Sequence, residues 1–171
     1  MNDASRTAAQ LRQDFDGSFA EAPHGEREAR EDFLAIRLAG DAHAVRLADV
    51  ACLLPLTSLT RLPSPVSELI GIIGFRGAIV PAYDLGALLG YAAQDPPRWL
   101  MIAAARPAAL AFGAFEGHLR LARGAGAPQP GTEPARRHVR DVLRTPEGVR
   151  PVVSIESVLE TIETIVQQGF D

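Results

Sequence analysis

Short apolar runs separated by turn residues make up most of the chain from residue 32 onward. Glycine, proline and aspartate interrupt the runs "DFLAIRL" (32–38), "AIVPAYDL" (78–85), "RWLMIAAA" (98–105), "ALAFGAFEGHLRL" (109–121) and "GVRPVVSI" (148–155). Runs of this length between frequent turn signals are typical of β-strands. We therefore predict a mainly β protein, a sandwich or barrel with one or two helices attached.

Helical periodicity is expected at both ends of the chain. Residues 1–30 form an extension in which Leu11, Phe15 and Phe19 share one face of a short amphipathic helix, with Ser5 as its N-cap, followed by a polar linker. A partly disordered tail is the alternative interpretation of this segment. Near the other end, "ESVLETIETIVQQG" (156–169) predicts a helix with an apolar stripe, and residues 166–171 are expected to form a tail.

Prolines and glycines set the expected limits of the elements between these ends. The segment 57–73 contains Pro63 and Pro65 and predicts a loop, and the segment 125–137 predicts a Pro/Gly-rich surface loop. The strand that follows Gly77 is expected to end near Pro81. One short helical turn after it, "GALLGY" (86–91), is expected to stop at Gly90.

A weak internal repeat relates the two halves of the chain. At an offset of 70 positions, "VPAYDLGALL" (80–89) lies over "RPVVSIESVL" (150–159), so that Pro81 matches Pro151. At an offset of 66, Phe33 falls on Trp99 and Ile36 on Ile102. The repeat predicts two similar β-lobes, each made from a hairpin, a loop, and a strand that leads into a short helix.

Composition changes this picture mainly by exclusion. The 171 residues are 47% hydrophobic and 22% charged, with a net charge of −4, which does not favour nucleic acid or an anionic membrane as a partner. All 17 basic residues are arginine, which excludes a Schiff-base lysine and a P-loop lysine. The single cysteine, Cys52, excludes an internal disulfide. With neither a signal peptide nor an apolar run long enough for a membrane helix, we expect a cytoplasmic protein without direct membrane insertion.

A search for catalytic sets indicates that the protein is not an enzyme. The histidines His24, His43, His118 and His138 are scattered without metal-ligand spacing, and each is expected at the surface or in a turn. Cys52 lies in the apolar run "VACLLPL" and is expected to be a small core or interface residue, and Ser154 lacks the context of a nucleophile elbow. We therefore predict no catalytic residue, no metal and no cofactor.

The stretch "GIIGFRGAIVPAYDL" (71–85) holds one charge between two apolar segments. Its glycines Gly71, Gly74 and Gly77 lack the spacing of the dinucleotide-binding fingerprint, so we interpret them as turn and bulge positions that need a positive φ or a close backbone approach. Asp84 is expected to end the strand or cap a helix. Arg76 is then either a recognition group presented to a partner or an internal lock that bonds the carbonyls of its own turn.

The same residues resemble the signature of the CheW-like domains of bacterial chemotaxis. In that family a glycine, an apolar pair, an "N-L-R-G"-like turn, then "I-V-P-V-V-D-L" and a short helix recur. Gly71, Arg76, Gly77, Val80, Pro81, Asp84 and Leu85 stand at the matching positions. The flanking segments "FLAIRLAGDAHAVRLADVACLLPL" and "HVRDVLRTPEGVRPVVSIESVLETI" are also similar, and the likeness covers about residues 31–165.

The resemblance implies two intertwined SH3-like five-stranded β-barrel lobes with short helices and a C-terminal helix. Lobe one would span about 41–106, and lobe two about 31–40 and 107–165. It implies a non-catalytic adaptor of two-component signalling that couples the cytoplasmic tip of a chemoreceptor to the regulatory domain of a CheA-type histidine kinase. Partner contacts would then involve Phe75, Arg76 and Gly77, together with position 52.

Several residues depart from the family pattern. Cys52 stands where the family often has an acidic residue that contributes to receptor contact, and the turn is "G-F-R-G". The loop at 124–137 has Pro128, Pro130 and two arginines in place of the usual apolar residues. These departures leave open a scaffold or inhibitor that binds a kinase regulatory domain without a receptor. A small hydrolase built on a β-barrel is a third alternative, which no sequence feature favours.

Overall fold

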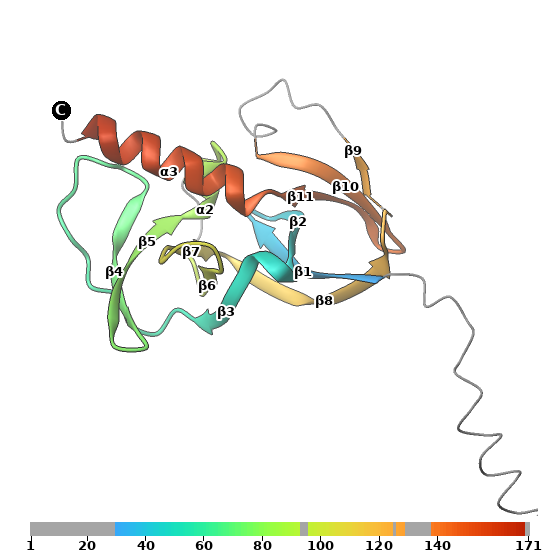
Figure 1. Ribbon diagram of the computed structural model, residues 1–171, viewed down its shortest axis with the longest axis horizontal. Helices are drawn as coiled ribbons and strands as arrows, with labels where there is room; N and C mark the ends of the chain where they lie inside the picture. The colour runs from blue at the N-terminus through green and yellow to red at the C-terminus, as the bar shows by residue number, and fades with distance from the viewer. Residues whose placement is uncertain (1–29, 93–95, 125, 129–137, 170–171) are drawn as a thin grey trace, which may run out of the picture.

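The computed structural model describes residues 30–92, 96–124, 126–128 and 138–169 (Figure 1). The N-terminal helix and most of the loop at 125–137 that the sequence predicts lie outside these residues. The elements in chain order are β1 (Arg30–Leu38), β2 (Asp41–Arg46), η1 (Leu47–Asp49), β3 (Val50–Pro55), β4 (Leu69–Phe75), β5 (Ala78–Asp84), α2 (Leu85–Leu88), β6 (Trp99–Ala103), β7 (Ala109–Phe112), β8 (Ala114–Ala122), β9 (Gly126–Pro128), β10 (Val139–Thr145), β11 (Gly148–Val153) and α3 (Ile155–Gly169).

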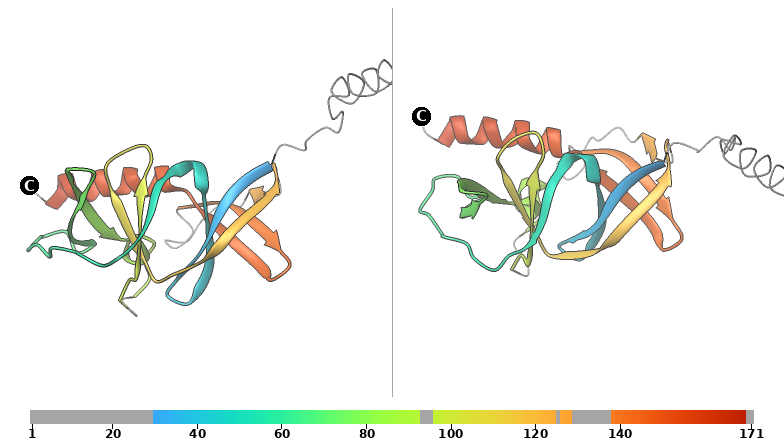
Figure 2. Two further views of the ribbon diagram at one scale, coloured as in Figure 1. Left: turned by 90° about the horizontal axis from the view of Figure 1, so that it is seen from below. Right: turned by 60° about the horizontal axis from the view of Figure 1, so that its bottom comes forward.

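The strands form two curled sheets that lie side by side (Figure 2). The first lobe has the strand order β3-β6-β7-β5-β4, and the second lobe has the order β8-β1-β2-β11-β10-β9. Apart from the three-residue edge strand β9, the second order repeats the first, with β1 in the place of β6 and β11 in the place of β5. The predicted repeat is therefore confirmed, and the fold is mainly β as expected.

The two lobes are intertwined because the chain crosses between them twice. It starts in the second lobe with β1 and β2, passes through η1 into the first lobe, and returns after β7 to form β8. The expected lobe ranges place β2 in lobe one and β7 in lobe two, whereas the sheets place them the other way round. The reason is local: β1 and β2 form an antiparallel hairpin with a two-residue turn, and β6 and β7 form one across residues 104–108. A hairpin keeps both its strands in one sheet.

The run "ALAFGAFEGHLRL" forms two strands, not the single strand expected. β7 ends at Phe112 in the first lobe, and β8 begins at Ala114 in the second. The residue between them, Gly113, lies close to the backbone of β1, where an added Cβ would be 3.4 Å from the Arg37 carbonyl oxygen. Since both flanking segments contribute apolar side chains to the interior, the hydrophobic pattern continues across the crossover and does not mark it.

Pro81 lies inside β5, so the expectation that it ends the strand is wrong. It pairs with Ile72 of β4, whose N–H and C=O both bond to Thr60 at 2.9 Å and so leave no group facing Pro81. On the other side of β5, pairing with β7 begins only at Ala82. Proline is tolerated in a strand where no ladder bond needs its missing N–H, and both sides of Pro81 meet that condition.

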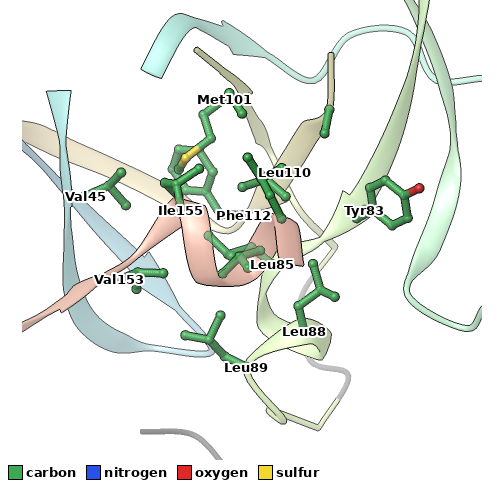
Figure 3. Packing of buried hydrophobic residues seen from close by; sticks show 14 of the residues in the cluster. Val45, Tyr83, Leu85, Leu88, Leu89, Met101, Leu110, Phe112, Val153 and Ile155 are labelled. Atoms are coloured by element: carbon green, nitrogen blue, oxygen red, sulfur yellow. The ribbon is translucent and has the colours of Figure 1, made fainter. Parts of the chain in front are cut away.

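The largest hydrophobic cluster joins the two lobes. It contains Leu34, Ile36 and Val45 from the second lobe, residues of β5 to β7 from the first lobe, and the apolar stripe of α3. Figure 3 shows Ile155 of α3 among side chains of both lobes. Two smaller clusters fill the individual lobes, one around Ile73 and Val80 and one around Phe33 and Leu143. The lobes therefore share one large core, and each also has a smaller cluster of its own.

The helices confirm the expected caps and correct one boundary. Asp84 is the N-cap of α2, and its Oδ1 accepts the Ala87 N–H at 3.1 Å. Gly90 follows this helical turn with a φ of 84°. On α3, Val158, Leu159 and Ile162 are buried. The helix continues to Gly169, so residues 166–169 belong to it and not to a tail.

Candidate functional site

The candidate site is the tip of the β4–β5 hairpin, formed by Phe75, Arg76, Gly77 and Ala78. Phe75 pairs with Ala78, so Arg76 and Gly77 form a two-residue loop, with φ values of 49° and 79°. Two consecutive positive φ values define a type I′ turn, in which Asn or Gly is usual at the first position. An arginine there costs roughly 1–2 kcal/mol of backbone strain. Such strain at an exposed turn points to a function of the side chain.

The Arg76 side chain is presented to solvent. Its guanidinium lies 5.1 Å from the centre of the Phe75 ring, a cation–π distance. Within the described part of the chain it makes no hydrogen bond or ion pair, so the internal lock considered from the sequence is not found. The ring below orients the cation and leaves its five N–H donors available for a carboxylate or a carbonyl.

The glycines below the tip have different reasons for being glycine. A Cβ on Gly71 would lie 2.3 Å from the Thr60 carbonyl oxygen, because the chain at 60–61 crosses β4 there and closes the first lobe. Gly77 needs its positive φ for the turn. Gly74 has neither a positive φ nor a neighbour within 4 Å of an added Cβ, so the predicted requirement for glycine fails at that position.

Exposed β-branched side chains accompany this hairpin and its equivalent in the second lobe. Ile79, the second residue of β5, is 74% exposed. A hollow of about 220 Å³ beside it is lined by Ser58, Thr60 and residues of β4. Val149, which matches Ile79 at the offset of 70, is 61% exposed on β11. The internal repeat could have pointed to Ile79 and Val149 as equivalent residues, but neither was predicted from the sequence as a candidate site residue.

Cys52 does not lie at the tip of the hairpin. It is half-buried on β3, at the other end of the strand order from β4, and pairs with Ile102 of β6. Its side chain packs against the cluster around Ile73 and Val80. The other predicted residues of the stretch support the tip from below: Gly71 and Gly74 lie in β4, Pro81 in β5, and Asp84 at the far end of β5. Phe75, Arg76 and Gly77 are the ones that form the surface.

Two histidines are buried, so the expectation of surface or turn positions is wrong for them. His43 is 3% exposed and His138 is 2% exposed. The Nδ1 atom of His43 lies 3.1 Å from the Asp41 carbonyl oxygen, which can only accept, so Nδ1 carries the proton. Nε2 then accepts from the Tyr91 hydroxyl at 3.2 Å. Burial holds the pKa of His43 below its usual range.

Neither buried histidine lines the two cavities described for this chain, although Tyr91 lines one of them. His138 Nδ1 lies 3.0 Å from the Ser157 hydroxyl, but the ring is buried and Ser157 lines neither cavity. Within the described ranges, no three His, Cys, Asp or Glu side chains gather in a way that would hold a metal ion. None of the helices in these ranges has the length and apolar character needed to cross a membrane.

Comparisons with known proteins agree with this geometry. The family model described as a CheW-like domain matches residues 32–163. Among solved structures, the scaffolding protein TtCheW from Thermoanaerobacter tengcongensis superposes with a TM-score of 0.65 at 20% sequence identity, covering 73% of this chain and 89% of that chain. No curated protein matches the chain in sequence. At 20% identity the superposition establishes only the fold. Assignment of the chain to a family rests on the family model, which matches most of its length.

Proposed function

Since the chain belongs to the CheW-like domain family, we propose that it is a non-catalytic adaptor that couples chemoreceptors to a CheA-type histidine kinase in the cytoplasm. The observation that carries the proposal is the Arg76 turn. An arginine held in a strained conformation, without an internal partner, is explained by binding to another molecule.

The charge and shape of the hairpin support a protein partner. Arg76 provides a cation that a carboxylate of the partner would pair with, and Ile79 provides exposed apolar surface next to it. This combination of an arginine and an apolar neighbour is common at the centre of protein interfaces. The equivalent Val149 on the other lobe offers a second apolar contact, as an adaptor with two partners requires.

The test is binding of the purified protein to a kinase regulatory domain and to a receptor cytoplasmic fragment, separately and together. Arg76→Ala is expected to weaken receptor binding or ternary assembly about tenfold or more, as loss of a central arginine does at interfaces. Arg123→Ala is the matched control, because Arg123 is also exposed and has no ion-pair partner among the described residues. Equal ternary assembly by wild type and Arg76→Ala would remove Arg76 from this role.

A second candidate function rests on Cys52. The resemblance leads us to expect an acidic residue at this position for receptor contact, and a half-buried thiol does not replace its charge. The alternative is a scaffold that binds a kinase regulatory domain and no receptor. Binding of the kinase domain alone would favour it. In that case Cys52→Glu is expected to introduce receptor binding, whereas Cys52→Ala is not.

A further inference from the structure

A cleft between the two lobes, remote from the β4–β5 hairpin tip, has the shape of a ligand site. Its walls are the β1–β2 turn of the second lobe, the start of α2, the segments around Tyr91 and at 96–98, and the β7–β8 crossover. Its volume is about 310 Å³, at the lower end of the range for small organic ligands. We propose that this interlobe cleft binds a small organic carboxylate with an apolar body.

The apolar surface of the cleft comes mainly from Pro96 and Pro97, with the small side chains of Ala87 and Ala92. Leu38 and Phe112 lie behind this surface; at 1% and 2% exposed they belong to the shared core and fix its shape. The proline and alanine side chains provide a surface on which the body of a ligand gains free energy by leaving water.

Arg98 supplies the charge. Arg98 is exposed, lines the cleft and has no ion-pair partner among the residues that the structure describes. Its backbone is fixed, because its N–H donates to the Phe112 carbonyl at 3.0 Å and its carbonyl accepts from Leu56 at 2.8 Å. Arg98 therefore offers a free planar donor group from a rigid base, which suits a carboxylate.

Arg37 adds a hydrogen-bond donor to the cleft although its charge is paired. Its Nε donates to Glu116 and its Nη1 to the Gly40 carbonyl, at 2.5 and 2.7 Å, which leaves Nη2 without a bond in the described chain. Glu116 is shared with the buried Arg150, whose Nη1 lies 2.7 Å from its other oxygen. Arg150 also bonds Glu147, at 3.3 Å, so the two guanidiniums and two carboxylates of this cluster balance in charge. Arg37 therefore contributes its free Nη2 donor to the cleft and not a net charge.

The remaining polar groups of the cleft are already occupied. Asp84 is the one acidic side chain described in the lining, and its Oδ1 accepts the Ala87 N–H. The Tyr91 hydroxyl donates to His43. Among the lining residues that the structure describes, free donors therefore outnumber free acceptors, which favours an anion over an amine. Asp84 nevertheless limits the affinity for an anion, and this provides a test.

The experiment uses three probes that share one body: phenylacetate, its neutral amide phenylacetamide, and phenethylamine. Backbone amide chemical shifts of the full chain are titrated with each. Phenylacetate is expected to bind and to shift the amides of Gly40, Gly86 and Gly113, which line the cleft. The amide and the amine are expected to bind at least about tenfold more weakly, the loss that one charge-assisted hydrogen bond of about 1.5 kcal/mol represents.

Two variants separate the charges. Arg98→Gln is expected to weaken phenylacetate binding about tenfold, by the same charge-assisted bond. Asp84→Asn retains the helix cap but removes the negative charge, so it is expected to strengthen phenylacetate binding. Arg123→Gln, an exposed arginine outside the cleft, is expected to change nothing. The proposal is overturned if phenethylamine binds as well as phenylacetate, if Arg98→Gln binds it like wild type, or if the shifted amides lie elsewhere. None of these outcomes depends on the adaptor function.

Discussion

At the scale of single residues, Arg76 combines a cost in stability with exposure of its side chain. The sequence placed a charge on a turn, and the structure shows that the turn is type I′ with arginine at its first position. The same turn type joins β1 to β2, where Ala39 has a φ of 51°. These two hairpins allow the effect of strain to be separated from the effect of binding.

Arg76→Asn is expected to stabilise the protein while weakening its binding to partners. Asparagine adopts a positive φ more easily, so the free energy of unfolding should rise by about 0.5–1 kcal/mol. Urea unfolding and the partner-binding assay measure the two effects. Ala39→Asn is the control, since it should give the stability gain without loss of partner binding. A variant at position 76 that gains stability and keeps full binding would show that the strain has no functional role.

The glycines of β4 predict opposite outcomes for the same substitution. Gly71→Ala forces a Cβ to within 2.3 Å of the Thr60 carbonyl oxygen, so the backbone must move, at a cost of about 2–3 kcal/mol. Gly74→Ala meets no neighbour within 4 Å and should change the free energy of unfolding by less than about 0.5 kcal/mol. Urea unfolding of both variants measures the difference. Similar values for the two would contradict the close packing of 60–61 on β4.

At the scale of elements, the repeat gives the lobes one topology but different helices. In the first lobe β5 leads into the four-residue α2, and in the second β11 leads into the fifteen-residue α3. α3 reaches back over the first lobe, as Figure 1 shows, and its buried side chains enter the cluster that both lobes share. The helix thereby connects the lobes through packing.

Leu159→Ala is expected to destabilise both lobes together. Leu159 is 4% exposed, and truncating a buried leucine costs about 2–5 kcal/mol. Urea unfolding followed by fluorescence of the single tryptophan, Trp99 in the first lobe, and by far-ultraviolet circular dichroism for the whole chain should give coincident transitions at a lower midpoint. The exposed Glu160→Ala is the control. A lower midpoint by one probe only, with the other unchanged, would show that the lobes unfold independently.

At the scale of the whole molecule, the direct contact between the lobes includes a titratable pair, the buried His43 and the half-buried Tyr91. His43 belongs to β2 in the second lobe, and Tyr91 follows α2 in the first. The charged groups that act on the ring are Asp41, which raises its pKa, and Arg150, which lowers it, but burial has the largest effect and lowers it. The folded protein therefore holds His43 neutral at neutral pH.

The stability of the protein is expected to fall on mild acidification because of His43. The unfolded chain takes up a proton near the ordinary pKa of 6.5, whereas the folded ring does so only at lower pH. Below about pH 7 the unfolded state then binds more protons, so the free energy of unfolding decreases as the pH falls. Urea unfolding between pH 7.5 and about 5.5, a range set to bracket the histidine titration, should show this slope in wild type and a smaller one in His43→Gln. Equal slopes would contradict it.

Much of the fold could be predicted because it depends on local pattern. Alternating apolar runs indicated the strands, the offsets of 66 and 70 indicated two lobes, and Asp84 was correctly interpreted as a helix cap. Sheet membership of β2 and β7 was not predictable in the same way. A strand has the same apolar pattern in either lobe, because strands of both lobes bury apolar side chains in the shared core.

For the sites, the sequence by itself determined the position of Arg76 on a glycine turn and the absence of lysine chemistry, since these depend on residue type and neighbours. Only the tertiary structure showed that Arg76 has no internal partner in the described chain, that His43 meets Tyr91, and that Arg37 and Arg98 border one cleft. Each of these facts joins segments 48 or more positions apart along the chain or depends on what surrounds a side chain. The packing of the two intertwined lobes decides these contacts, and the spacing of residues along the chain does not encode that packing.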